Sequence, residues 1–419
     1  MRVTHWGNRV DLQSGETLRA IELFAGAGGL GMGVSKAGFS HDLVVEWDQY
    51  ACDTIRKNQK RNINPVGNWP EVSQTDVRAI DFTQFNGKLD LVAGGPPCQP
   101  FSMGGKRRGP MDHRDMFPQA VRAVRESAPR AFLFENVKGL LRPSLGNYFT
   151  YIVLQLTYPD FVQNPGERWE DHYSRLEKYH TSGIRDGLYY RVVYRVLNAA
   201  NYGVPQKRER VFIVGFRSDL GLEWSFPQAT HSEDALKYSK WVTGDYWEKH
   251  ELPNKKFAGV PRGLKTYIEK SKRSKIKPNL KPWRTVRDAI RGLPEPGENY
   301  TNIFNHLPTN PSKSYPGHTG SPLDEPAKTL KAGAHGVPGG ENTLVYPNGR
   351  MRYFTVRESA RLQTFPDNYQ FHGSWGECMR QLGNAVPVIL GLTVAKSVRE
   401  KLDNLDNKKI VKFRSGKTA

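Results

Sequence analysis

The chain has 419 residues, of which 61 are Lys or Arg and 42 are Asp or Glu, so its formal net charge is +19. Its 37% hydrophobic content is enough to bury a sizeable core, and its length predicts two or three domains or one large domain with insertions. The positive surplus favours a polyanionic partner, nucleic acid first, although it could serve solubility alone. Three widely separated cysteines indicate neither a disulfide framework nor a zinc site, so we expect a reduced compartment and no metal.

No segment predicts a membrane partner. The amino terminus is polar without an apolar signal core, and the longest apolar stretch, about 386–395, is too short to span a bilayer.

From residue 18 to about 216, apolar runs alternate with helical patterns. Five runs predict buried parallel strands: LRAIELF, DLVVE, LDLVAGG, RAFLFEN and RVFIVGF. The alternation predicts an α/β fold with a doubly wound sheet, mixed but mostly parallel, in a first domain over 1–217. The aromatic, charged segment 138–187 interrupts this rhythm, and we interpret it as an insertion between two sheet elements.

Residues 218–354, rich in Pro, Gly, Asn and Lys, predict a second, smaller and irregular domain. Between 251 and 290 the chain carries twelve Lys or Arg against three acids. Such a run is usually a solvated surface, but contact with phosphates is the sharper hypothesis. Helical periodicity then returns, so that 355–405 completes the first domain and 406–419 is predicted to be a basic, frayed tail.

A glycine-rich turn, Phe24–Gly31, follows the first strand, where backbone could approach a ligand or simply join strand to helix. Twenty residues past Gly26, Glu46 ends the next strand and is placed to accept hydrogen bonds from a ribose. Trp47 could lie against an adenine face, and Asp76 could accept from the adenine amine. Together they predict a cofactor containing adenosine, which could be a nicotinamide dinucleotide or a methyl donor.

A cysteine in a proline-bounded turn, GGPPCQPFS, follows the strand LDLVAGG. A lone cysteine such as Cys98 is more often a buried small hydrophobe than a nucleophile, but these flanking residues suit an exposed turn. Glu135 ends the next strand and is predicted to share the same edge of the sheet. Arg208 and Arg210, on alternate positions, point the same way and could hold Glu135, a phosphate or the oxygen of a base.

Eight sequence blocks, in this order, resemble those of the DNA cytosine-5 methyltransferases and cover most of the chain. They are FAGAGGLGMG, VVEWD, DVRAID, GGPPCQPFS, ENVKG, QKRERVFIVG, RESARLQTFPD and QLGNAVP. The resemblance implies the fold of S-adenosylmethionine-dependent methyltransferases, with DNA held between the sheet domain and a target-recognition domain over 218–354. It also implies that S-adenosyl-L-methionine is the cofactor, bound by Phe24, Gly26, Gly28, Gly29, Glu46, Trp47, Asp76, Val77, Pro97 and Asn384.

The resemblance further implies that Cys98 attacks carbon 6 of a cytosine while Glu135 stabilises the charge that develops on ring nitrogen 3. Arg208 and Arg210 would secure the base oxygen and orient Glu135. The cytosine must leave the duplex stack, and the loop 102–114 is expected to close over it. The residues predicted to contact DNA are Gln99, Ser102, Lys106, Arg114, Thr329, Lys331 and His335.

Two alternatives stay open: a related enzyme that methylates transfer RNA, and a catalytically inactive DNA-binding homologue. We expect a bacterial enzyme of the cytoplasm that is associated with the nucleoid through duplex DNA and acts as a monomer. We also expect it to serve a restriction-modification system, with a restriction endonuclease acting on the same site without a stable complex. The sequence does not state the recognition site.

Overall fold

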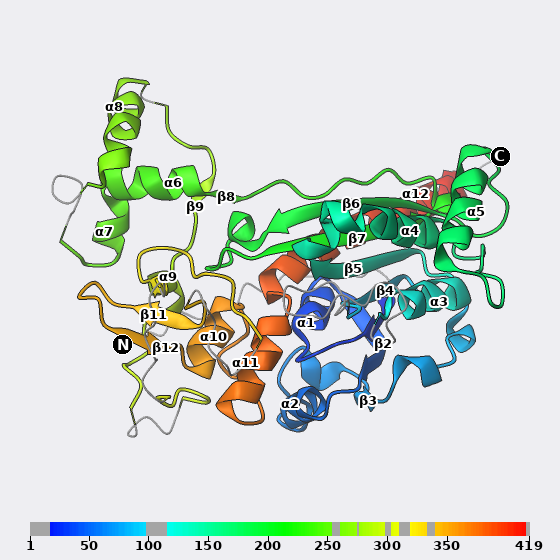
Figure 1. The fold of residues 1–419 in the computed structure, drawn as a ribbon, viewed down its shortest axis with the longest axis horizontal. Helices are drawn as coiled ribbons and strands as arrows, with labels where there is room; N and C mark the ends of the chain where they lie inside the picture. The colour runs from blue at the N-terminus through cyan, green and yellow to red at the C-terminus, as the bar shows by residue number, and fades with distance from the viewer. Residues whose placement is uncertain are drawn as a thin grey trace.

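A seven-stranded sheet forms the centre of the larger part of the molecule (Figure 1). The computed structural model describes residues 17–97, 115–253, 260–274, 276–297, 303–309, 319–332 and 340–415. The strand order is β3-β2-β1-β4-β5-β7-β6. The strands are β1 (Leu18–Leu23), β2 (Phe39–Glu46), β3 (Ser73–Gln74), β4 (Leu91–Gly94), β5 (Ala131–Val137), β6 (Tyr190–Asn198) and β7 (Glu209–Arg217).

Strand β7 runs against its neighbours. The pairs among β1 to β5 are parallel, whereas β7 pairs antiparallel with both β5 and β6. The sheet is therefore mixed and mostly parallel, as predicted, but the prediction that RVFIVGF is a parallel strand is wrong. Only residues 199–208 connect β6 to β7, too few for the crossover that parallel neighbours need. Strand β6, largely exposed at the sheet edge, is missing from the predicted set.

Helices cover both faces of the sheet. One face, with Ile21 and Phe134, packs against α3 and α4, and the opposite face, with Ala20 and Leu133, packs against α1 and α12. These two apolar layers explain why β5 is buried at every position but its last. The helices of this part are α1 (Gly29–Lys36), α2 (Gln49–Lys60), α3 (Phe117–Ser127), α4 (Gly146–Thr157), α5 (Trp169–Thr181) and α12 (Val388–Ser415).

The segment 138–187 contributes to the core of the sheet domain. It contains α4 and α5, and the inward face of α4 carries aromatic and aliphatic side chains at helical spacing. Six of them are buried: Tyr148, Phe149, Tyr151, Ile152, Leu154 and Leu156. The aromatic residues that suggest an insertion therefore belong to α4, the helix between β5 and β6, and lie on the face of that helix that packs on the sheet.

The described residues of 218–354, here the smaller region, form short elements whose buried side chains share apolar clusters with residues of the sheet domain. A two-stranded and a three-stranded sheet lie in this region, and helices α6 to α8 form a lobe on the far side from α3 to α5 (Figure 1). The elements are β8 (His231–Ser232), α6 (Glu233–Tyr238), α7 (Asp245–Lys249), α8 (Lys265–Ser274), β9 (Lys281–Pro282), α9 (Val286–Ile290), β10 (Ser321–Pro322), β11 (Thr343–Val345) and β12 (Met351–Tyr353).

The chain returns to the sheet domain through α10 (Val356–Leu362) and α11 (Trp375–Asn384). A capping box starts α10, in which Thr355 and Glu358 each accept a backbone N–H of the other. The last helix, α12, continues to Ser415. It therefore extends into the segment 406–419, for which the sequence predicts a frayed tail. The stretch Trp375–Asp406 is apolar and long enough to cross a membrane, but 72% of its most apolar window is buried, as in a core helix.

Candidate active site

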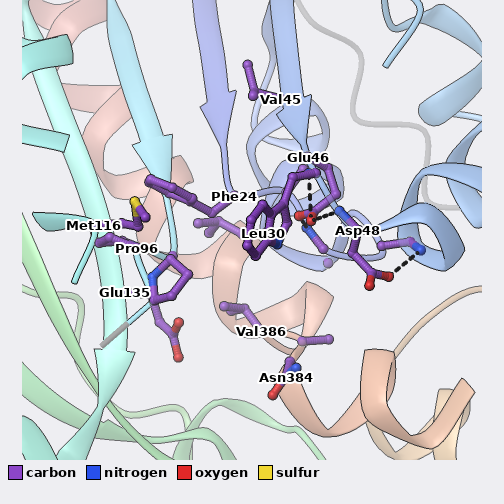
Figure 2. Close-up of a pocket in the computed structure, with 18 of the residues that line it drawn as sticks. Phe24, Leu30, Val45, Glu46, Asp48, Pro96, Met116, Glu135, Asn384 and Val386 are labelled. Atoms are coloured by element: carbon purple, nitrogen blue, oxygen red, sulfur yellow. Dashed lines mark hydrogen bonds between the residues drawn. The ribbon is translucent and has the colours of Figure 1, made fainter. Parts of the chain in front are cut away.

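A cavity of about 520 Å³ opens where β1, β2, β4 and β5 end (Figure 2). In the view of Figure 2, Glu46 and Glu135 lie on opposite sides of the cavity, with Phe24 and Leu30 between them. Nine of the ten residues predicted to bind cofactor line it, and Glu135 and Arg210 line it too. The nine are Phe24, Gly26, Gly29, Glu46, Trp47, Asp76, Val77, Pro97 and Asn384.

Glu46 organises one side of the cavity. Its Oε2 accepts from Gly26 N at 2.7 Å, and its Oε1 accepts from Trp47 N at 2.9 Å and Asp48 N at 2.8 Å. Burial raises the pKa of Glu46, and these backbone donors act against that rise. The carboxylate thus fixes the glycine turn and still has lone pairs for a hydroxyl donor in the cavity.

The glycines of the turn serve different purposes. Gly26 lines the cavity at φ +54°, and a Cβ built on it would meet nothing within 4 Å, which leaves room for a ligand. A Cβ on Gly29 would stand 2.3 Å from Val386 O, so this glycine lets α1 pack against the segment before α12. Gly28, predicted to bind cofactor, does not line the cavity; it faces the Trp69 ring.

Two predicted adenosine contacts lie at the rim. Trp47 is 69% exposed, which leaves its ring faces accessible for stacking. The carboxylate of Asp76 is paired with Arg78 at 2.6 Å, and this contact lowers the pKa of Asp76. Asp76 is thus already occupied by an arginine that also lines the cavity.

Sequence reasoning missed an ion pair on the same wall. Arg380 Nη2 contacts Asp48 Oδ2 at 2.8 Å, and both residues line the cavity. Asp48 also caps α2 by accepting from Ala51 N. The sequence offers one signal for this pair: Asp48 directly follows Trp47, and Arg380 directly precedes the QLGNAVP block.

Glu135 and Arg210 form a buried ion pair on the other side of the cavity. Arg210 Nε lies 2.9 Å from Glu135 Oε1, and both side chains are about nine-tenths buried. The antiparallel register pairs Arg210 with Val137, which puts Arg210 diagonally across from Glu135 on the same face. Burial raises the pKa of Glu135, and the charges of Arg210 and Arg208 oppose that rise. A carboxyl in this setting can hold a proton closer to neutral pH than an exposed one.

Arg208 does not line the cavity, although it was predicted to act with Arg210 on the base. It is fully buried, and it donates from Nη1 to Leu330 O at 3.0 Å and from Nη2 to Gly383 O at 2.7 Å. Burial lowers the pKa of Arg208. The two arginines share a face of the chain but hold different partners.

The turn before Cys98 is anchored on both sides. Asn136 Nδ2 donates to Pro96 O at 2.8 Å, and Met116 N donates to Pro97 O at 3.2 Å. These bonds fix the chain at the edge of the cavity next to Glu135. Several predicted residues lie outside the described part of the chain: Cys98, Gln99, Ser102, Lys106, Arg114 and His335.

The other two cysteines are poor nucleophiles. Cys52 and Cys378 are buried, and burial raises the pKa of each thiol to about 12. Both are protonated at neutral pH, whereas the reactive form is the thiolate. No cluster of three or more His, Cys, Asp or Glu side chains within the described residues could hold a metal ion.

Two residues predicted to contact DNA have partners within the protein. Thr329 Oγ1 donates to Lys207 O at 2.6 Å, and Lys331 Nζ pairs with Glu341 at 2.5 Å while staying nearly half exposed. Thr329 therefore helps to join the smaller region to the sheet domain, whereas the ion pair of Lys331 lies within the smaller region.

Comparisons with known proteins agree on one family. The family model of the C-5 cytosine-specific DNA methylases matches residues 18–161 and 171–400. The Type II methyltransferase M.PspPI of Psychrobacter sp. is 33% identical over 412 residues, 95% of this chain and 83% of that protein. The Type II methyltransferase M.Eco47II of Escherichia coli is 33% identical over 410 residues, 94% of this chain and 82% of that protein.

A solved structure supports the fold. A putative DNA modification methyltransferase encoded within an Escherichia coli prophage superposes with a TM-score of 0.54 at 21% identity, over 92% of this chain and 99% of that one. The chain belongs to the C-5 cytosine-specific DNA methylase family and is a DNA cytosine-5 methyltransferase.

Proposed function

We propose that the cavity binds S-adenosylmethionine on the side of Glu46 and receives a cytosine, rotated out of duplex DNA, on the side of Glu135. The observation that carries this proposal is the position of both acids on one cavity beside the Pro96–Pro97 turn. The lining fits the cofactor, because Gly26 leaves open space, Glu46 can accept from a ribose and Trp47 offers an aromatic face. When bound, the cofactor supplies an electrophilic methyl group.

Cys98 is the nucleophile in this proposal. Its thiolate adds to carbon 6 of cytosine, which makes carbon 5 nucleophilic and moves negative charge toward ring nitrogen 3. Glu135, with its pKa raised by burial, donates a hydrogen bond or proton there, and Arg210 holds its carboxyl in place. After carbon 5 has taken the methyl group, a base removes its proton and the thiolate leaves carbon 6. The high pKa values of the other two thiols support Cys98 for this role.

The smaller region supplies DNA contacts in this proposal. Lys270, Lys272 and Arg273 are exposed on α8, where cations suit the phosphates of a duplex. Thr329 and the backbone of Lys331 lie where this region meets the sheet domain, next to Lys207 and Gly383 respectively. Contacts to bases in this area would set the methylated sequence.

We further propose that the enzyme works as a monomer in a bacterial restriction-modification system. The names of the relatives M.PspPI and M.Eco47II, both Type II methyltransferases, support this role. Methylation would then protect cytoplasmic DNA from an endonuclease that reads the same site.

Two measurements test the function. Bisulfite sequencing of DNA from cells that express the chain should show one short sequence with a protected cytosine. Duplex DNA that carries 5-fluorocytosine at that position should become covalently attached to the protein when cofactor is present. Methyl transfer to transfer RNA alone would favour the first alternative, and no labelling of any nucleic acid would favour an inactive homologue.

A further inference from the structure

A buried polar junction connects the smaller region to the edge of the cavity. Residues 327–332 of the smaller region lie against the loop that precedes β7, where Leu330 N donates to Gln206 Oε1 at 2.9 Å and Ala327 N donates to Pro205 O at 3.0 Å. Arg208, two residues beyond Gln206, then donates to Leu330 O and to Gly383 O. One guanidinium thus bridges a backbone carbonyl of each region.

The second carbonyl belongs to the cavity wall. Gly383 and its neighbour Asn384 both line the cavity. A Cβ built on Gly383 would stand 2.1 Å from Ala332 N, so the backbone of α11 touches the backbone of the smaller region directly. Gln363 holds the same turn from the other side, with Nε2 donating to Leu382 O at 2.5 Å. The cavity wall at Asn384 therefore rests on this junction.

We propose that Arg208 is a positioning residue, which sets the cofactor-binding wall at Gly383–Asn384 by fastening it to residues 327–332 of the smaller region. This inference rests on the proposed function, because it assumes that the cavity binds S-adenosylmethionine. The sequence resemblance assigns Arg208 to the oxygen of the cytosine base, whereas this proposal assigns it to the cofactor side of the site. A shift of residues 327–332 would then move the cofactor-binding wall through the two hydrogen bonds of Arg208, in addition to the direct backbone contact at Gly383.

The chemistry of the junction favours an arginine. A planar guanidinium can donate to two carbonyls at once in fixed directions, which an ammonium group does less well. Arg208 is fully buried and has carbonyl partners in place of a carboxylate, and its Nε has no hydrogen-bond partner among the described residues. Arg210, two residues further on, shows the contrasting arrangement, since it pairs with Glu135 and lines the cavity.

The test measures the affinity of Arg208→Lys for S-adenosylmethionine in the absence of DNA. Two other arginine-to-lysine variants, Arg210→Lys and Arg217→Lys, are the matched controls. The lysine keeps a positive charge near Glu135 but cannot reproduce both directed bonds. We expect the Kd to rise at least about tenfold, the ratio that loss of one hydrogen bond to a charged group gives. At saturating cofactor, kcat and the yield of the 5-fluorocytosine adduct should stay close to those of the unchanged protein.

The controls separate this role from others. Arg210→Lys should show the reverse pattern, with unchanged cofactor affinity and lower kcat. Arg217→Lys alters another arginine of β7 that donates to a carbonyl, that of Ala128, away from the cavity; its cofactor affinity should be unchanged. Thr329→Val removes the hydroxyl bond to Lys207 O at the same junction and should raise the Kd in the same direction by a smaller factor. It tests the junction even if Arg208→Lys fails to fold.

The outcomes are distinct. If the unchanged protein binds no S-adenosylmethionine, the proposed function fails. If it binds, and both Arg208→Lys and Thr329→Val bind equally well, the positioning role is wrong. If Arg208→Lys loses the covalent adduct while its Kd for S-adenosylmethionine is unchanged, Arg208 acts on the cytosine base and not on the cofactor wall.

Discussion

The sheet domain and helix α8 of the smaller region use their cations differently. In the sheet domain, Arg130 contacts Asp90 and Asp406, and Arg122 contacts Glu126 and two backbone carbonyls. On α8, basic side chains are exposed, and the one residue of the helix that is buried is Ile268. The difference teaches that charge positions atoms inside the first region, whereas on α8 it faces outward toward whatever the protein binds. Variants of the sheet-domain cations at the site, Arg208 and Arg210, should alter cofactor affinity or rate, and variants of the exposed cations on α8 should alter DNA affinity.

The largest effect is expected at Cys98. Cys98→Ser should lower kcat by about 10³-fold or more, because the hydroxyl is a far weaker nucleophile at neutral pH. DNA affinity, measured by gel shift, should stay close to that of the unchanged protein. Covalent capture of 5-fluorocytosine DNA by the serine variant would show that another residue attacks carbon 6.

The next effect concerns the pH dependence set by Glu135 and Arg210. Burial raises the pKa of Glu135 and the charge of Arg210 lowers it, so activity should fall as pH rises through that pKa and the acid loses its proton. Arg210→Gln should move this falling limb of kcat to higher pH and reduce the maximal rate by about 10²-fold. Glu135→Gln, which cannot titrate, is the control that should abolish the limb. A limb that moves to lower pH in Arg210→Gln would contradict the assignment.

A smaller effect is expected on the cofactor side. Glu46→Gln replaces one acceptor oxygen by an amide NH2 that faces backbone donors, so the affinity for S-adenosylmethionine should fall by about 10-fold to 100-fold. Calorimetry or quenching of Trp47 fluorescence would measure it. Asp81→Asn is a matched control, since Asp81 is also held by a backbone N–H but lies outside the cavity lining. Equal losses in both variants would mean that Glu46 acts through stability alone.

The smallest effect on rate is expected on α8. Replacing Lys270, Lys272 and Arg273 by Gln should weaken duplex binding and lower the slope of log K against log salt by up to about 3. At saturating DNA, kcat should be unchanged, because no residue of α8 lines the cavity. An unchanged salt slope would break the comparison, since α8 would then be only a solvated surface.

The site could be predicted from the sequence where each residue is tied to the end of a strand. Glu46 is the last residue of β2 and Glu135 lies two residues before the end of β5, and parallel strands bring such positions to one edge of a sheet. Gly26 follows from its place after β1. The positions of these residues depend on short stretches of chain and on the apolar pattern of each strand, both of which can be recognised in the sequence.

The sequence by itself determined the chemistry available: an adenosine-type turn, a proline-bounded cysteine, and acids at strand ends. Only the tertiary structure decided that β7 runs antiparallel, which brings Arg210 to the carboxyl end of β5 beside Glu135. It also decided that Arg208, on the same face of the chain, reaches Leu330 and Gly383 instead of the cavity. The physical reason is that these partners lie 75 to 175 residues apart along the chain, so packing, and no local pattern, brings them together.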